Sequence, residues 1–411
     1  MAFPRRARRL FGYWRAERRT LRQGLVALVL STAASFVAGL TLAHISGTLA
    51  SLPGLLVLIP AAVGMRGTIF GAIGARLGTA THAGLFEANL RRGGILAQNV
   101  EVSVITTFAS SLWLALLAKL VAAAFGEHTI SLWDLVTISV VGGALGSVVI
   151  LLVTVGLSLL SYRRGYDLDA VSTPMVTAIG DMVTLPTLFL ATFITHIDGV
   201  NAVVSGLCVA ACLAATARAW TTDQAAVRRV VVEMVAVIAL TPLLDILAGA
   251  LLQARQPGLE ALPGLLILIP PFVSQAGALG CILSSRLTSK LQLGVITPRG
   301  RPEAPALVDA SLVVGAGAVI FLLIGTLALW LSMLTGLAHP SAWVMIGGTL
   351  LAGAFALPLT LIVGYYLAVV TSRFGLDPDN VGVPIITSVM DLAGVACVLS
   401  AMSLLGATVH G

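Results

Sequence analysis

The stretch "LPGLLVLIP" at residues 52–60 returns almost unchanged as "LPGLLILIP" at residues 262–270, an offset of 210 residues. The same offset aligns "VSTPMVTAIGDMVT" at residues 171–184 with "VGVPIITSVMDLAG" at residues 381–394. Unrelated apolar segments would not keep register over so long a distance. The sequence therefore predicts a duplicated fold whose two halves are built alike.

The composition excludes a water-soluble protein. The 411 residues are 58% hydrophobic and only 10% charged, and their mean hydropathy is +1.01, whereas soluble domains carry about 25% charged residues. We therefore expect an integral membrane protein in contact with the lipid bilayer. The net charge of +6 lies in a basic N-terminal segment and between apolar runs, which is typical of cytoplasmic loops and not of a nucleic-acid partner.

The apolar runs predict transmembrane helices. Most are about 20 to 30 residues long, which suits helices and is too long for the strands of a membrane barrel. We predict an all-α polytopic membrane protein with eleven spans, at residues 24–46, 51–80, 95–125, 131–161, 171–196, 199–219, 230–253, 261–290, 306–337, 341–371 and 381–408.

The eleven spans divide into two five-helix repeats and one joining helix. The predicted domains are a basic cytoplasmic segment at 1–23, a first repeat at 24–198, a linker helix at 199–220 and a second repeat at 221–411. Because five helices end on the far side, the linker brings the chain back, and the two repeats are parallel. The basic loops predict a cytoplasmic N-terminus, an outside C-terminus and a location in the plasma membrane, in a bacterium the inner membrane.

Asp181 and Asp391 are the residues least expected in such segments. Each is the eleventh residue of its span, about 15 Å along the helix and therefore near the bilayer midplane. A carboxylate there costs about 2.5–3.5 kcal/mol. We predict that pseudo-symmetry brings both to one central cation site. The alternative is that each is protonated and hydrogen-bonds a neighbouring helix.

Hydroxyl groups accompany both aspartates. Thr177 precedes Asp181 by four residues and Thr387 precedes Asp391 by four, so hydroxyl and carboxylate share a helix face. We predict these two threonines as further oxygen ligands. Two more threonines extend the face in the first repeat as lower-ranked pore residues, namely Thr173 and Thr184.

The ligand chemistry favours a hard cation. No His or Cys accompanies either aspartate in sequence, which disfavours zinc or copper. Pro174 and Pro384 are expected either to free backbone carbonyls as additional ligands or only to kink the helices. Mg²⁺ is the preferred ion because one or two carboxylates hold it through water. Mn²⁺, Co²⁺ and Ca²⁺ stay open as alternatives.

Other polar residues within the spans give weaker signals. Asn99 and Asp309 are matched near the start of the third helix of each repeat, where they would line a cytoplasmic vestibule or sit at the membrane interface. Arg66 has no charged counterpart, because Ala276 holds its place in the second repeat. Asp245 occurs only in the second repeat, deep in its helix, where an arginine could pair with it.

The quoted motifs resemble a known family. "PGLLVLIPAAVGMRGTIFGAIGARLGTA" and "PGLLILIPPFVSQAGALGCILSSRLTS" resemble the second helix of the MgtE integral membrane domain. "PMVTAIGDMVTLP" and "PIITSVMDLAGV" resemble its last helix, whose aspartate is the pore Mg²⁺ ligand. The tandem arrangement with a joining helix resembles the solute carrier 41 branch, in which two MgtE-type domains are fused.

The resemblance covers about residues 24–408 and implies a divalent-cation transporter, most of all for Mg²⁺. Asp181 and Asp391 would take the place of the pore aspartates, and one chain would work as a monomer that mimics a dimer. The CBS sensor of the family cannot be carried over, because only about 23 residues precede the first helix.

The sequence also bears on two other classes of function. A proton- or sodium-coupled transporter of a small solute could use the same aspartates, but it would need further polar groups near the midplane. An enzyme is not expected, because the sequence has no nucleophile–base set and no phosphate-binding loop. The sequence leaves open whether the pathway is a channel or an exchanger.

Overall fold

The described part of the chain folds entirely into helices and turns. The computed structural model describes residues 18–45, 47, 52–82, 91, 93–126, 129–164, 168–197, 199–376 and 381–406. Its helices are α2 (Arg18–His44), α4 (Leu55–His82), α5 (Ile95–Ala124), α6 (Leu132–Arg164), α7 (Leu168–Thr195), α8 (Val200–Thr221), α9 (Ala225–Gln253), α10 (Gln256–Ala261), α11 (Gly264–Gln292), α12 (Ala304–Thr335), α13 (Ala342–Phe374) and α14 (Val383–Leu404).

Eleven of the helices in the described residues are long and apolar enough to cross a membrane, and α10 is the short exception. This confirms the predicted all-α polytopic membrane fold. Helices suit such a chain because each satisfies its own backbone hydrogen bonds where lipid offers no partner.

The helix ends differ from the predicted spans by a few residues, and one helix was not predicted. α2 begins at Arg18 and not at residue 24, so the last residues of the predicted basic segment 1–23 are helical. Residues 1–17 and 407–411 lie outside the described residues. α10 was not predicted, because its six residues, QPGLEA, carry no apolar periodicity.

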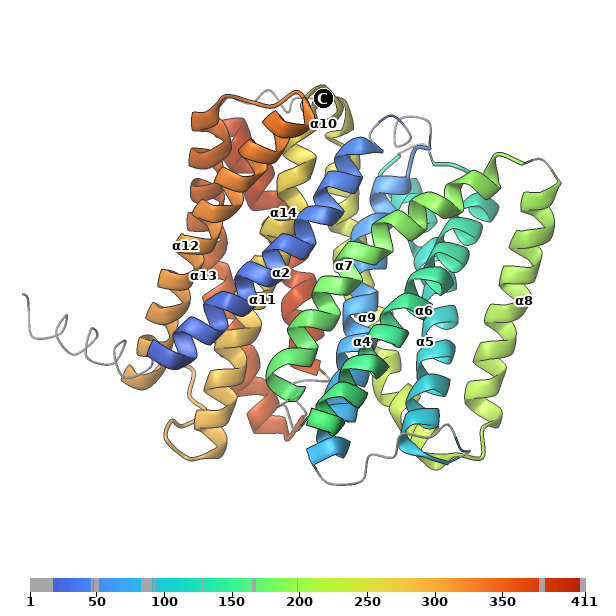
Figure 1. The fold of residues 1–411 in the computed structure, drawn as a ribbon, viewed down its shortest axis with the longest axis horizontal. Helices are drawn as coiled ribbons and strands as arrows, with labels where there is room; N and C mark the ends of the chain where they lie inside the picture. The colour runs from blue at the N-terminus through green and yellow to red at the C-terminus, as the bar shows by residue number, and fades with distance from the viewer. Residues whose placement is uncertain are drawn as a thin grey trace, which may run out of the picture.

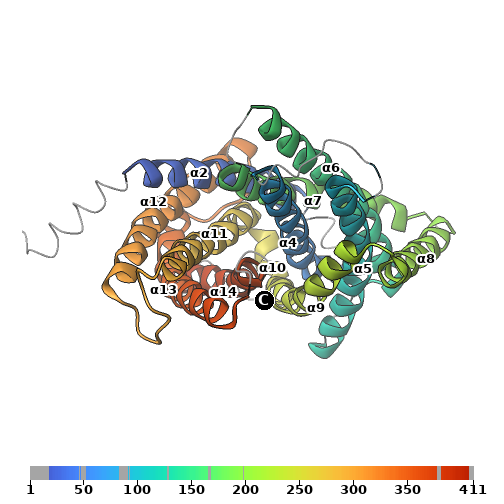
Figure 2. The ribbon, with the colours of Figure 1, turned by 90° about the horizontal axis from the view of Figure 1, so that it is seen from below.

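The two repeats start at the same end of the molecule. The first repeat consists of α2 and α4–α7, and the second consists of α9 and α11–α14. In Figure 1, α2 and α9 both rise from the lower end, and α8 runs back down between them in sequence at the outer edge. Figure 2 shows α8 at the periphery, with α4 and α11 in the interior. The joining helix therefore returns the chain to the starting side.

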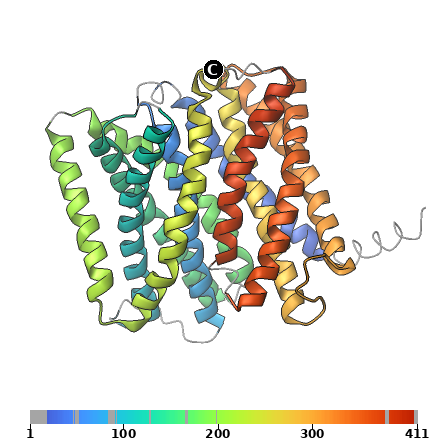
Figure 3. The ribbon, with the colours of Figure 1, turned by 180° about the vertical axis from the view of Figure 1, so that it is seen from behind.

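The first helix of each repeat packs against the second helix of the other. α2 contacts α11, and α9 contacts α4. In Figure 1, α2 crosses in front of α11 and runs beside α7, whereas Figure 3 shows α9 beside α14 on the opposite face. The repeats thus exchange their first helices, and the surfaces at the centre of the molecule combine side chains of both.

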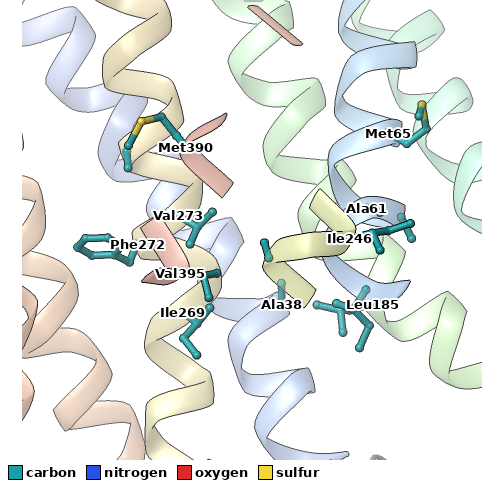
Figure 4. Packing of buried hydrophobic residues seen from close by; sticks show 14 of the residues in the cluster. Ala38, Ala61, Met65, Leu185, Ile246, Ile269, Phe272, Val273, Met390 and Val395 are labelled. Atoms are coloured by element: carbon teal, nitrogen blue, oxygen red, sulfur yellow. The ribbon is translucent and has the colours of Figure 1, made fainter. Parts of the chain in front are cut away.

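Apolar side chains fix how the central helices are rotated. Phe272 and Val273 of α11 lie beside Val395 of α14 (Figure 4). On its other side, Phe272 stacks on Phe321 of α12 with ring centroids 4.7 Å apart. This dense packing determines which of the neighbouring polar side chains face the interface between the repeats.

Two glycines at equivalent positions let the exchanged helices meet backbone to backbone. A β-carbon built on Gly39 of α2 would lie 3.0 Å from the Cα of Ile267 on α11. A β-carbon built on Gly249 of α9 would lie 2.7 Å from both the Leu56 carbonyl oxygen and the Val57 Cα on α4. Backbone atoms cannot swing aside, so a larger residue must push the helices apart.

We expect alanine at either glycine to destabilise the fold. Gly39→Ala and Gly249→Ala each force a methyl group against backbone, and such overpacking costs about 1–3 kcal/mol. Each variant should show a lower midpoint of thermal unfolding in detergent, with losses of similar size because the two contacts are equivalent.

Gly206 on α8 provides the matched control. A β-carbon there would meet no atom within 4 Å, so Gly206→Ala should leave the unfolding midpoint unchanged or slightly higher. Equal midpoints for all three variants would contradict the exchanged packing.

Candidate functional site

The carboxylate of Asp181 is held by serines from both repeats. Asp181 lies on α7 and is 7% exposed. Its Oδ2 accepts one hydrogen bond of 3.0 Å from Ser35 on α2 and a second of 3.0 Å from Ser274 on α11. The exchange of first helices makes this possible, because it brings α2 and α11 together beside α7. Two donors on one oxygen fix the carboxylate and leave the other oxygen free of these contacts.

Asp391 lies in the equivalent place on α14, with a second carboxylate beside it. Its side chain contacts Asp245 of α9, and Asp245 also accepts a hydrogen bond from Ser388. Both carboxylates face the same point of α4: a β-carbon built on Gly64 would lie 2.9 Å from Asp245 Oδ2 and 3.3 Å from Asp391 Oδ2. Only glycine leaves space for two carboxylates at this point.

The two half-sites are related position by position. Asp181 corresponds to Asp391, Ser35 to Asp245, and Ser274 to Gly64, all at the offset of 210 residues. Each aspartate is bounded by helices of both repeats, with Asp181 against α2 and α11 and Asp391 against α4 and α9. The aspartates therefore lie at one interface between the repeats, as part of two half-sites with different neighbours.

The arrangement suits an ion that keeps part of its water shell. Within the described ranges, no three acidic, His or Cys side chains lie close enough together to hold a metal ion. The oxygen atoms present are carboxylates and serine hydroxyls, which are hard ligands. A hydrated hard cation can be bound through its water by one or two carboxylates, as Mg²⁺ often is.

The predicted threonines have different surroundings. Thr387 donates to the carbonyls of Val383 and Pro384 in its own helix, at 3.2 and 3.0 Å. Thr184 is buried and donates to the Gly180 carbonyl at 2.7 Å. Both hydroxyl groups thus donate their hydrogen to a backbone carbonyl, and only the lone pairs of their oxygen atoms remain to coordinate a cation. The side chains of Thr173 and Thr177 lie outside the described side chains.

The expectation that Pro384 frees a backbone carbonyl stays a prediction. Pro384 lies in the first turn of α14, and the carbonyl that its ring would leave unbonded belongs to residue 380, outside the described residues. The carbonyl of Pro384 itself accepts from Thr387. Pro174 lies inside α7, which begins at Leu168.

The two residues of the matched pair Asn99 and Asp309 differ in their contacts. Asp309 is fully buried and forms ion pairs with Arg286 at 3.0 Å and Lys290 at 2.5 Å. Asn99 is buried and donates to the Ile95 carbonyl of its own helix at 2.9 Å. Because two cations already balance Asp309, its contacts favour the interfacial alternative over a vestibule.

Sequence reasoning did not find the role of Asp245. Instead of the arginine that could pair with it, the structure brings Asp391 to Asp245, and none of the ion pairs among the described residues includes Asp245. The alignment of the repeats already pairs Asp245 with Ser35, because the two residues are 210 positions apart and therefore lie at equal depth. It could be interpreted only once the exchange of first helices was known.

A further polar contact borders the site. Gln275 follows Ser274 on α11, is fully buried, and donates to Ser31 on α2 at 3.2 Å, while its Oε1 has no hydrogen-bond partner. Ser31 lies one turn before Ser35, so this contact ties the same two helices that hold Asp181.

Comparison with known proteins places the chain among transporters. The model of the MgtE family, described as a divalent cation transporter, matches residues 59–191 and again residues 269–401. Solute carrier family 41 member 3 of Mus musculus is 24% identical over 365 residues, which cover 83% of this chain and 73% of that protein. No solved structure matches the chain. Because the two family matches cover more than half of the chain and each contains one of the aligned aspartates, the chain belongs to the MgtE family of divalent cation transporters.

Proposed function

We propose that the chain carries Mg²⁺ across the membrane along the interface between its two repeats, with Asp181 and Asp391 as the main ligands. The observation that carries this proposal is the pair of equivalent carboxylates at the repeat interface, each bounded by helices of both repeats. The family match supports a divalent cation over a small organic solute as the substrate.

The ligand set supports Mg²⁺ without excluding its chemical relatives. Two carboxylates supply a charge equal and opposite to that of the ion, and the neighbouring serines can bind water in its shell. Thr177 and Thr387 each precede their aspartate by four residues, about one helical turn, and are proposed as the next oxygens along the path. Mn²⁺ and Co²⁺ share this ligand preference and are expected to compete.

We further propose that the lower end in Figure 1 faces the cytoplasm of a cell whose plasma membrane holds the protein. Arginines gather at that end: Arg218, Arg228 and Arg373 lie in the terminal turns of α8, α9 and α13, and Arg299 lies in the loop between α11 and α12, whereas Arg255 lies between α9 and α10 at the opposite end. The excess of basic loops supports this orientation through the positive-inside rule. The two five-helix domains at 24–198 and 221–411 would make one complete path in a monomer.

Neutralising the aspartates should abolish transport without unfolding the protein. Asp181→Asn and Asp391→Asn each remove one charge from the proposed site, and each should weaken the apparent Mg²⁺ affinity by about 10- to 100-fold. The double variant should show almost no flux. The measurement is Mg²⁺ uptake into proteoliposomes with an enclosed indicator dye.

Asp309→Asn is the matched control, because it makes the same change at another buried carboxylate. Removing the partner of Arg286 and Lys290 should cost about 3 kcal/mol of stability, while the Mg²⁺ affinity of the folded fraction should stay at the wild-type value. Wild-type flux in a folded Asp181→Asn/Asp391→Asn variant would remove the aspartates from the mechanism.

Removing the serines that hold Asp181 should weaken Mg²⁺ binding measurably, but less than removing the charge of the aspartate. In Ser35→Ala/Ser274→Ala the carboxylate loses both donors, and hydrogen bonds to charged groups contribute about 1.5–3 kcal/mol each. We expect several-fold weaker Mg²⁺ affinity in the same uptake assay. Ser103→Ala serves as the control, because Ser103 donates only to the Val100 carbonyl of its own helix. Equal affinities in the two variants would show that the serines do not orient the ligand.

A further inference from the structure

A cluster of buried polar side chains lies between α4, α5 and α6 of the first repeat. Its members are Arg66 on α4, Thr107 and Ser111 on α5, and Ser147 on α6, and none is more than 7% exposed. The three helices pack against one another. The Mg²⁺ path proposed above uses none of these four residues, so the cluster calls for an explanation of its own.

Arg66 is a buried cation whose hydrogen-bonding capacity is largely unused. It is 2% exposed, and its guanidinium group carries five N–H donors. Nη1 donates to the Ala62 carbonyl of its own helix, and Nε has no hydrogen-bond partner. Among the described residues Arg66 forms no ion pair. A charge so placed within a membrane-spanning bundle is costly unless a partner of opposite charge neutralises it.

The acidic side chains described on the helices of the first repeat have other partners. Glu101, near the start of α5, pairs with Arg218 of α8 at 2.9 Å. Asp134, in the first turn of α6, accepts a hydrogen bond from Asn201 of α8. Asp181 on α7 accepts from two serines of α2 and α11, and α4 itself carries no acidic residue. No described carboxylate on α4–α7 therefore balances the positive charge of Arg66.

The hydroxyl groups in the cluster also have unused donors. A β-carbon built on Gly143 of α6 would clash with Arg66 Nη2 and lie 2.6 Å from Ser111 Oγ, so the guanidinium and this hydroxyl meet over a glycine. One turn further along α6, Ser147 accepts a hydrogen bond of 3.0 Å from Thr107. Neither the Ser111 nor the Ser147 hydroxyl donates to another described residue. Guanidinium and hydroxyl donors thus share one buried region, and an anion can accept from all of them.

The second repeat fills the same region with apolar side chains. A β-carbon built on Gly353 of α13, the equivalent of Gly143, would clash with the ring of Phe321 on α12. At the offset of 210 residues, the replacements are Arg66 to Ala276, Thr107 to Gly317, Ser111 to Phe321 and Ser147 to Leu357. The fold of a repeat therefore does not require polar groups here, and the charged cluster is a property of the first repeat alone.

We propose that the first repeat binds a small monovalent anion such as chloride between α4, α5 and α6, as the counter-ion of Arg66. The Nε and Nη2 groups of Arg66 and the hydroxyls of Ser111 and Ser147 supply its hydrogen bonds. One guanidinium balances one negative charge, whereas a phosphate would bring a second charge that no group of the cluster neutralises. The anion lies outside the proposed Mg²⁺ path, and its binding does not depend on the proposed function.

Thermal unfolding of the purified protein in detergent tests the site without any transport measurement. Sodium chloride is titrated in while sodium gluconate, whose anion is too large for a buried site, keeps the ionic strength constant. The wild-type unfolding midpoint should rise by about 2–4 °C and then level off, because a ligand that binds only the folded state stabilises it by mass action. Bromide should act like chloride, and an anomalous difference map from crystals grown with bromide should show a peak beside Arg66.

Two variants locate the effect. Arg66→Ala removes the guanidinium and should abolish the rise with chloride. If that variant does not fold, the fourfold variant Arg66→Ala/Thr107→Gly/Ser111→Phe/Ser147→Leu replaces it, because it carries the side chains with which the second repeat fills the same region. The fourfold variant should fold and should show the same unfolding midpoint in chloride and in gluconate.

Arg229→Ala is the matched control, because Arg229 is an exposed arginine that pairs with Glu233 on its own helix. This variant should keep the full rise with chloride. A rise that persists in Arg66→Ala or in the fourfold variant would overturn the proposal. So would a wild-type midpoint that is the same in chloride and in gluconate, or a bromide map of the wild type without a peak at Arg66.

Discussion

A carboxylate buried in a membrane-spanning bundle must be matched by hydrogen-bond donors or positive charge, and the centre of this molecule is organised around that requirement. Asp181 meets it in part through Ser35 and Ser274, which approach from helices of different repeats. Asp391 meets it poorly, because its nearest partner is another carboxylate, Asp245. Because the protein does not supply enough donors or positive charge to these carboxylates, a bound cation can supply the missing positive charge.

The exchange of first helices makes this geometry possible. If α2 packed only within its own repeat, Ser274 of α11 and Ser35 could not meet at one oxygen of Asp181. The glycine contacts at Gly39 and Gly249 bring the exchanged helices close enough for short serine side chains to reach. Duplication within one chain also allowed the two half-sites to diverge, since Asp245 and Arg66 could appear in one repeat without appearing in the other.

The fold was largely predictable from the sequence, whereas the contacts at the site were not. Apolar runs and a repeat in strict register identify the eleven spans and place Asp181 and Asp391 at equal depth, because helix length and periodicity are local properties. Which helix faces which aspartate is a tertiary property: Ser35 is 146 residues from Asp181 along the chain.

The central claim is that both repeats build one site for one divalent ion in a single chain, and Mn²⁺ provides the most direct test because it scatters anomalously and shares the ligand preference of Mg²⁺. An anomalous difference map from crystals grown with Mn²⁺ should show one peak per chain at the repeat interface. Asp181 and Asp391 should both bind it, directly at about 2.1 Å or through one water. A peak that only one aspartate contacts, or a site formed between two chains, would contradict the account.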